Sequence, residues 1–96
     1  MWACAVRVEL HLGAVQSLKE KRAVLRPHIE RLKKLASVSV AEVDNHDFWQ
    51  RATLGLAVVA PDRTHLDSIL ERLRRYLDSQ IDIEMIDLSV TYLEEP

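Results

Sequence analysis

The chain has 96 residues, a formal net charge of -2 and a hydrophobic content of 48%. This length supports one hydrophobic core, and the composition lacks the low hydrophobicity and high net charge that are typical of disorder. The balanced charge argues against a generally basic surface, so contact with nucleic acid would need a local basic patch. We therefore expect one domain over residues 1–96.

The cysteine content and the hydropathy pattern bear on the compartment. Cys4 is the only cysteine, so an internal disulfide is impossible and a reducing cytoplasm is the natural location. Arg7 and Glu9 interrupt the apolar run at the N-terminus, which is unlike a signal peptide. No segment reaches the roughly 20 apolar residues that span a bilayer. We expect a cytoplasmic protein without membrane contact.

The first half of the chain reads as a strand followed by a helix. Strict alternation over residues 2–12 predicts a half-buried strand. Ser17 and Glu20 then form a capping-box pattern. In this pattern the Ser17 hydroxyl accepts a hydrogen bond from the Glu20 amide and the Glu20 carboxylate reaches back, so a helix should begin there. Pro27 falls inside this helix and removes one backbone amide. It predicts a kink or a loosened turn over residues 23–27.

The second half begins with two short strands that a turn connects. Residues 37–43 and 50–60 alternate in hydropathy and predict strands two and three. The sequence Asp44-Asn45-His46-Asp47 between them is typical of a turn, so a hairpin is the simplest connection.

A second helix and a last strand complete the pattern. Either Asp62 or Thr64 can cap the helix, which should end near residues 78–80. The last strand is predicted to place Ile86 on its inward side with Leu88.

The resulting order, β-α-β-β-α-β, predicts an α+β fold of the ferredoxin-like type. Right-handed crossovers favour a four-stranded antiparallel sheet with both helices on one face. The open sheet face should then carry mostly small side chains: Ala3, Ala5, Arg7, Glu9, Ser39, Ala41, Arg51, Thr53, Gly55, Ala57, Val59, Ser89 and Thr91.

This open face suggests self-association more than base stacking. RNA-recognition motifs share the topology but use aromatic residues on their central strands, and this chain has none at those positions. Small side chains permit close approach of another surface, so a homo-oligomer that forms through the sheet is one hypothesis.

The first helix is strongly basic although the whole chain is acidic. It has seven cations against Glu20 and Glu30, a local charge of +5 that a phosphate backbone could use. The alternative is an ordinary solvated face whose cations pair with acidic strand ends. The candidate nucleic-acid-binding residues are Lys19, Lys21, Arg22, Arg26, Arg31, Lys33 and Lys34.

The densest polar cluster contains Glu42, His46 and Asp47, which could bind a divalent ion or move a proton. Its spacing matches no metal motif, and ordinary hairpin chemistry is the alternative reading. With two glycines the chain also has no glycine-rich phosphate loop. No catalytic residue, metal ligand or cofactor is predicted, and a small enzyme built on this cluster is the weakest hypothesis.

Two stretches go beyond generic pattern: Ser17-Leu18-Lys19-Glu20-Lys21-Arg22, and residues 38–42 continuing through Asp47, Trp49, Gln50, Arg51 and Ala52. Together they resemble the YlxP-like family, domain-of-unknown-function family 503, over essentially the whole chain. The resemblance implies a ferredoxin-like fold, and no catalytic role is established for the family at these positions. The family's genes often neighbour those for translation initiation and ribosome maturation, which implies an association with ribosome assembly. The positions it highlights are Ser17, Lys19, Glu20, Lys21, Arg22, Glu42, Asp47, Trp49 and Gln50.

Two roles remain open for these positions. In the structural role, Lys21 or Arg22 pairs with Glu42 or Asp47, and Trp49 anchors the hairpin. In the functional role, the basic helix and the hairpin bind RNA or a ribosome-assembly component, and the protein is a non-enzymatic binding factor. The second role is the leading hypothesis.

Overall fold

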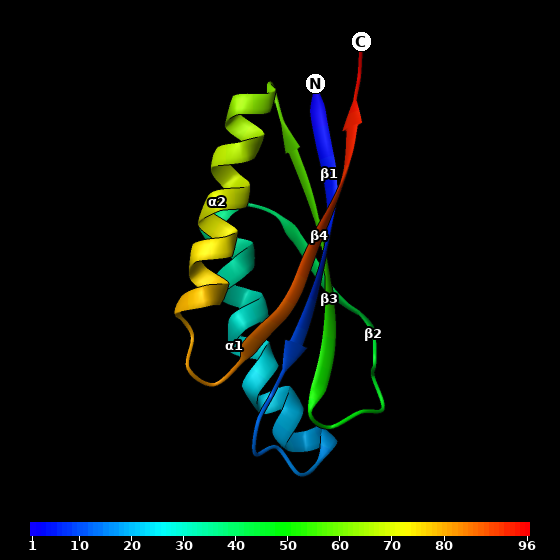
Figure 1. The fold of residues 1–96 in the computed structure, drawn as a ribbon, viewed down its shortest axis with the longest axis vertical. Helices are drawn as coiled ribbons and strands as arrows, with labels where there is room; N and C mark the ends of the chain where they lie inside the picture. The colour runs from blue at the N-terminus through cyan, green and yellow to red at the C-terminus, as the bar shows by residue number, and fades with distance from the viewer.

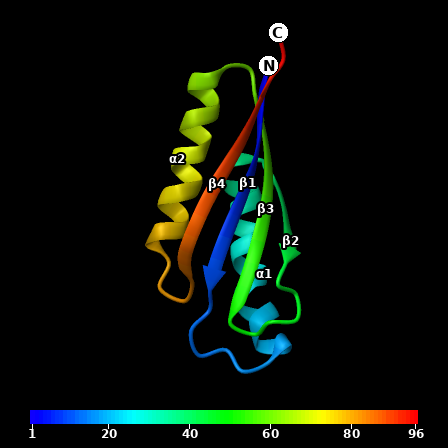
Figure 2. The same cartoon turned by 45° about the vertical axis from the view of Figure 1, so that its right-hand side comes forward.

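The computed structural model describes residues 1–96 and confirms the ferredoxin-like α+β fold. The elements are β1 (Trp2–His11), α1 (Leu18–Ala36), β2 (Ser39–Asp44), β3 (Arg51–Ala60), α2 (Arg63–Ser79) and β4 (Glu84–Glu94). The strands form one sheet in the order β2-β3-β1-β4, and every neighbouring pair is antiparallel. Both helices cover one face of the sheet, and the two termini lie together at one end (Figure 1). The other face is open (Figure 2).

The core lies between the sheet and the two helices. Because side chains alternate along a strand, Val8 of β1 and Leu54 of β3 point toward the helices and are fully buried. Leu32 of α1 and Leu66 of α2 meet them and are equally inaccessible. Burial of each such side chain contributes about 1.5–3 kcal/mol. This packing fixes which face of each helix remains free for other contacts.

Helix α1 begins where the capping pattern predicts. The Ser17 hydroxyl accepts a hydrogen bond from the Glu20 amide at 3.1 Å. The Glu20 carboxylate reaches back to the amide of Gln16, one residue earlier than a capping box requires. The predicted loosened turn is wrong, because α1 continues through Pro27 without interruption. Pro27 and Ala23 are exposed, so water can hydrogen-bond the Ala23 carbonyl that has lost its amide partner.

Strand β4 contains a bulge that the alternating pattern does not reveal. Glu9 of β1 faces Asp87, whereas the next residue, Leu10, faces Met85, so Ile86 has no partner in the register. Ile86 is 55% exposed, and the prediction that it points inward is wrong. Met85 packs against the core instead.

Helix α2 is capped by Asp62, whose carboxylate accepts from the His65 amide at 2.7 Å. The helix ends at Ser79, within the predicted range. Neither helix has the length and apolar character that crossing a membrane requires.

Candidate nucleic-acid interface

Four exposed cations form a stripe along the free face of α1: Lys19, Arg22, Arg26 and Lys33. Their spacings of three, four and seven residues place them on one side of a helix with 3.6 residues per turn. We call these four residues the basic stripe.

The other two exposed candidates of α1 lie outside the basic stripe. Lys34 is exposed near the end of the helix. Arg31 lies on the side toward α2, where a hydrogen bond from its guanidinium to the Tyr76 side chain raises the pKa of Arg31.

Lys21 does not belong to this surface. Only 2% of its surface is exposed, so its inclusion among the phosphate-binding candidates is wrong. Its ammonium donates to the Asn45 carbonyl at 2.7 Å and lies 2.8 Å from Glu42 Oε2. The structure therefore shows the Lys21–Glu42 pair that the structural alternative anticipated.

Two hollows flank the middle of the basic stripe. One, of about 400 Å³, is lined by Lys19, Arg22, Ala23, Arg26, Pro27 and Glu30. The other, of about 220 Å³, is lined by Arg22, Leu25, Arg26, Ile29, Glu30 and Glu42 and thus reaches strand β2. Arg22 and Arg26 line both hollows. Within the basic stripe, these two guanidinium groups are therefore the ones that share a hollow with strand β2.

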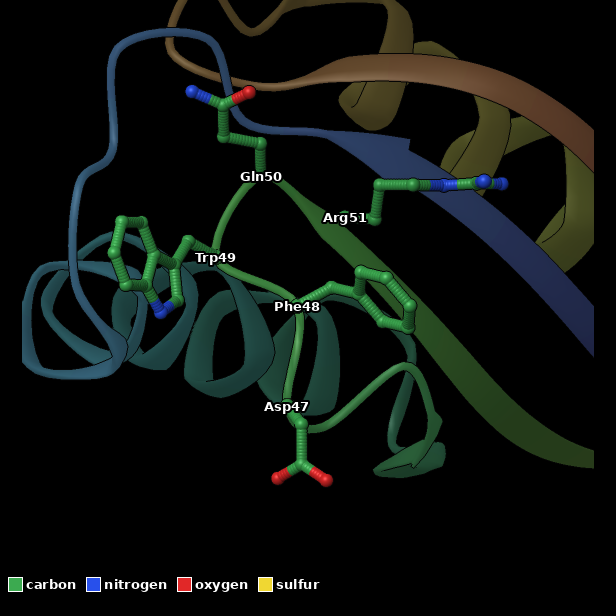
Figure 3. A pocket seen from close by; sticks show the side chains of 5 residues that line it. All are labelled: Asp47, Phe48, Trp49, Gln50 and Arg51. Carbon is green, nitrogen blue, oxygen red and sulfur yellow. The ribbon is translucent and has the colours of Figure 1, made fainter.

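The loop between β2 and β3 (residues 45–50, the hairpin loop) carries two adjacent exposed aromatic residues. Phe48 is 60% exposed and Trp49 is 52% exposed. Their rings point to opposite sides of the loop, and the Asp47 carboxylate points away from both (Figure 3). A hollow of about 450 Å³ is lined by residues 47–51. Since half of Trp49 is in solvent, burial of its ring is not the main anchor of the loop.

Gln50 provides the anchor that was expected of Trp49. Its side-chain amide donates to the Val15 carbonyl at 3.3 Å, and its backbone carbonyl accepts from the Leu12 amide at 2.9 Å. Both contacts tie the end of the hairpin loop to the β1–α1 connection.

A polar network on the open sheet face holds the beginning of the hairpin loop. Asn45 has a left-handed φ of 60° and donates from its amide to Thr53 Oγ1 at 2.8 Å. The Thr53 hydroxyl donates to Glu9 at 2.7 Å, and Arg7 binds Glu9 at 3.0 Å and Asp44 at 3.2 Å. Thr53 lies on the open face, as expected, but it is completely buried beneath these neighbours.

The same network changes the acidity of Asp44. The backbone amide of Asn45 donates to the Asp44 carboxylate at 2.7 Å, and the Arg7 guanidinium approaches its other oxygen. These contacts, chiefly the amide, lower the pKa of Asp44.

The three residues of the enzyme hypothesis do not converge. The Glu42 carboxylate turns inward to Lys21, and His46 Nε2 approaches the Glu42 backbone carbonyl at 3.1 Å instead of the carboxylate. Asp47 lines a hollow that contains neither of the others. No three His, Cys, Asp or Glu side chains lie close enough to hold a metal ion.

His28 is a polar residue whose environment the sequence did not indicate. It is 1% exposed, with Nδ1 2.7 Å from the Tyr76 hydroxyl and Nε2 2.8 Å from Asp82. The imidazole therefore joins α1, α2 and the loop before β4. Its spacing of three and four residues from Leu25 and Leu32 was the available signal for burial.

The fold and these surfaces define a ferredoxin-like α+β domain with one basic helix beside an exposed aromatic loop. The sequence profile of the family described as "Protein of unknown function (DUF503)" matches residues 4–90, so the chain belongs to that family. The chain is also similar to "Uncharacterized protein YlxP" of Bacillus subtilis (strain 168). The two are 40% identical over 68 residues, which cover 71% of this chain and 74% of that protein.

Proposed function

We propose that this protein is a cytoplasmic, non-enzymatic factor that binds RNA through the basic stripe and the hairpin loop. The observation that carries the proposal is the gathering of Lys19, Arg22 and Arg26 around one hollow of α1. Cationic side chains placed in this way match the phosphate oxygens of a nucleic-acid backbone.

The distribution of charge supports this choice of surface. Helix α1 carries seven cations and two carboxylates, a net charge of +5, whereas the whole chain has -2, which leaves -7 for the other residues. Strand β4 carries three carboxylates and no cation. Because screening limits attraction to about 8 Å at physiological salt, RNA would meet a favourable field at α1 and an unfavourable one at β4.

Two carboxylates near the hairpin loop are paired with cations of the protein itself. Glu42 pairs with Lys21, and Asp44 pairs with Arg7. The Asp47 carboxylate points away from the aromatic rings (Figure 3). On the α1 side, Glu30 lines both hollows and lies 3.5 Å from Lys33, so the unpaired cations of the basic stripe that a phosphate backbone would meet are Lys19, Arg22 and Arg26.

The length of the stripe suits a short run of nucleotides. Fourteen residues separate Lys19 from Lys33, a rise of about 21 Å along the helix axis. At about 3.4 Å per nucleotide in a stacked strand, this spans roughly six nucleotides.

The test compares two double charge reversals of equal size in an RNA-binding titration at several salt concentrations. Arg22→Glu with Arg26→Glu alters the basic stripe, and Arg74→Glu with Arg75→Glu alters exposed positions of α2. The stripe variant should bind much more weakly, and the salt slope of log K should fall by about 1.4, or about 0.7 for each lost phosphate contact. The α2 variant should retain most of the affinity. Equal, weak binding by the wild type and both variants would reject the proposal.

Self-association through the sheet is a second candidate, and a particular row of residues favours it. Ala3 faces Val59 on one side and Leu93 on the other, and these two are 65% and 68% exposed. The four strands offer a projected face of roughly 600 Å². This area is about three quarters of the ~800 Å² that each partner contributes to a standard interface.

The sheet hypothesis requires a dimer in light scattering that Val59→Glu with Leu93→Glu converts to a monomer. A wild-type monomer at every accessible concentration would exclude it.

A further inference from the structure

Phe48 and Trp49 differ from the other aromatic residues of the chain because no other ring and no guanidinium group packs against them. The chain has two tryptophans, two tyrosines and one phenylalanine. Trp2 and Tyr92 pack edge to face, and the Arg63 guanidinium lies over both rings at 5.0 and 4.0 Å. Tyr76 packs against His28 in the same edge-to-face manner.

The two rings without a partner are therefore adjacent in sequence and at least half exposed. Single exposed apolar residues are common on protein surfaces, but two consecutive large aromatic residues beside a basic helix form a more specific feature. Such rings offer flat faces on which another planar group can stack.

The loop that carries these rings is well fixed. Lys21 holds the Asn45 carbonyl at 2.7 Å, and the Phe48 amide donates to the same carbonyl at 3.1 Å. The contacts of Asn45 with Thr53 and of Gln50 with Val15 hold the loop at its two ends. A ligand that stacks on the rings would thus order little additional backbone, which favours binding.

The orientation of the rings indicates two separate positions rather than one sandwich. Phe48 and Trp49 point to opposite sides of the loop (Figure 3), so one planar group cannot lie between them. Two bases of one strand could each stack on one ring. The direct contact between Lys21 and Asn45 places this loop against the helix that carries the phosphate-binding stripe.

We propose that Phe48 and Trp49 stack on unpaired bases, so that the ligand of this surface is single-stranded RNA rather than a duplex. This inference rests on the proposed function of the basic stripe. In an A-form duplex the bases are stacked inside, and a protein reaches mainly phosphates and 2′-hydroxyls. A duplex can therefore use only the cations, whereas a single strand can use the cations and both rings.

The first experiment uses the fluorescence of Trp49. Trp2→Phe leaves Trp49 as the only tryptophan. A 12-nucleotide oligouridine should quench its emission in a saturable titration, and an RNA duplex of 12 base pairs should leave the emission unchanged at equal occupancy. Occupancy is measured independently from the anisotropy of labelled RNA.

The second experiment removes both rings with Phe48→Ala and Trp49→Ala. Because stacking of a base on an aromatic ring is strong, affinity for oligouridine should fall by at least about tenfold, with the salt slope unchanged. Affinity for the duplex should stay the same. Ile81→Ala with Ile86→Ala is the matched control, since it removes two exposed apolar side chains that belong to neither proposed surface and should affect neither ligand.

The outcomes separate the two proposals. Salt-dependent binding of both RNAs with equal affinity, unaffected by loss of the rings, would overturn the single-strand inference and leave the proposed function intact. The rings would then be free to contact a protein partner. Absence of salt-dependent binding to either RNA would reject the proposed function, and the inference with it.

Discussion

The ammonium of Lys21 lies 2.8 Å from Glu42 Oε2 and joins α1 to β2 from inside the domain. Glu42 Oε2 is itself buried and accepts no well-aligned hydrogen bond, so the contact is an ion pair. The same ammonium donates to the Asn45 carbonyl at the start of the hairpin loop. Lys21 and Glu42, which come from the two motif stretches of the sequence, therefore hold the loop against the helix.

Lys21→Met should destabilise the protein strongly. The change leaves the Glu42 carboxylate and the Asn45 carbonyl without their cationic partner. Loss of one member of a buried pair costs about 3 kcal/mol when the other keeps part of its hydration, as Glu42 does with 23% exposure. Urea unfolding monitored by circular dichroism measures the change in the free energy of unfolding.

The double variant Lys21→Met with Glu42→Leu is the decisive comparison. Replacing both charges by apolar groups removes the unpaired carboxylate, so most of the lost stability should return. Lys19→Met, at an exposed position of the same helix, should change stability by no more than about 0.5 kcal/mol. The single variant Glu42→Leu completes the cycle, and if its loss and that of Lys21→Met simply add in the double variant, the pair contributes nothing specific.

The sequence predicted the architecture because the strands and helices are strongly periodic. The alternation in β1 and β3 and the apolar stripe of α2 each determine which side is buried, and together they require two helices on one sheet face. Ile86 was misplaced because a bulge depends on the register between two strands, which the periodicity of one strand cannot show. The continuous helix at Pro27 was not predicted, because the cost of a proline depends on whether its helix face is in solvent.

The candidate site was less predictable, for reasons of long-range geometry. Lys21 has the same chemistry as Lys19 and differs only in facing a carboxylate on another element. The helical spacing relative to Leu25 could have indicated its burial, because positions four apart share a helix face. The partners of His28 lie 48 and 54 residues away, and no local pattern indicates them.

Tyr76→Phe should destabilise the protein by about 1–3 kcal/mol. The hydroxyl lies 2.7 Å from His28 Nδ1, and its loss would leave this nitrogen buried and without a hydrogen bond. Tyr92→Phe is the matched control, because Tyr92 is 40% exposed and its packing with Trp2 uses the ring. Thermal unfolding of the two variants compares them directly, and equal melting temperatures would show that the His28 contact is unimportant.

Gly55→Ala should destabilise the domain by about 1 kcal/mol, because an added Cβ would meet Val43 Cγ1 at 2.7 Å. Val43 is β-branched, so its side chain has few other rotamers available. Introducing Gly55→Ala in a Val43→Ala background should remove the cost. The measurement is a double-mutant cycle in urea, and the clash would be disproved if Gly55→Ala had the same effect in both backgrounds.

Asp44→Asn should reduce the loss of stability that the wild type shows as the pH falls below about 4. The pKa of Asp44 is lowered in the folded protein, chiefly by the Asn45 amide and then by Arg7, while in the unfolded chain it keeps the ordinary value near 4. The unfolded state therefore binds more protons in this range, and the stabilisation present above about pH 4 is lost as the pH falls through the lowered pKa. The variant should be less stable than the wild type at pH 7 and nearly equal to it at the acid end. Urea midpoints from pH 7 down to pH 2.5 test this, with Asp47→Asn as the control at a carboxylate that accepts no hydrogen bond. A constant difference between the Asp44→Asn and wild-type curves over the whole range would contradict the assignment.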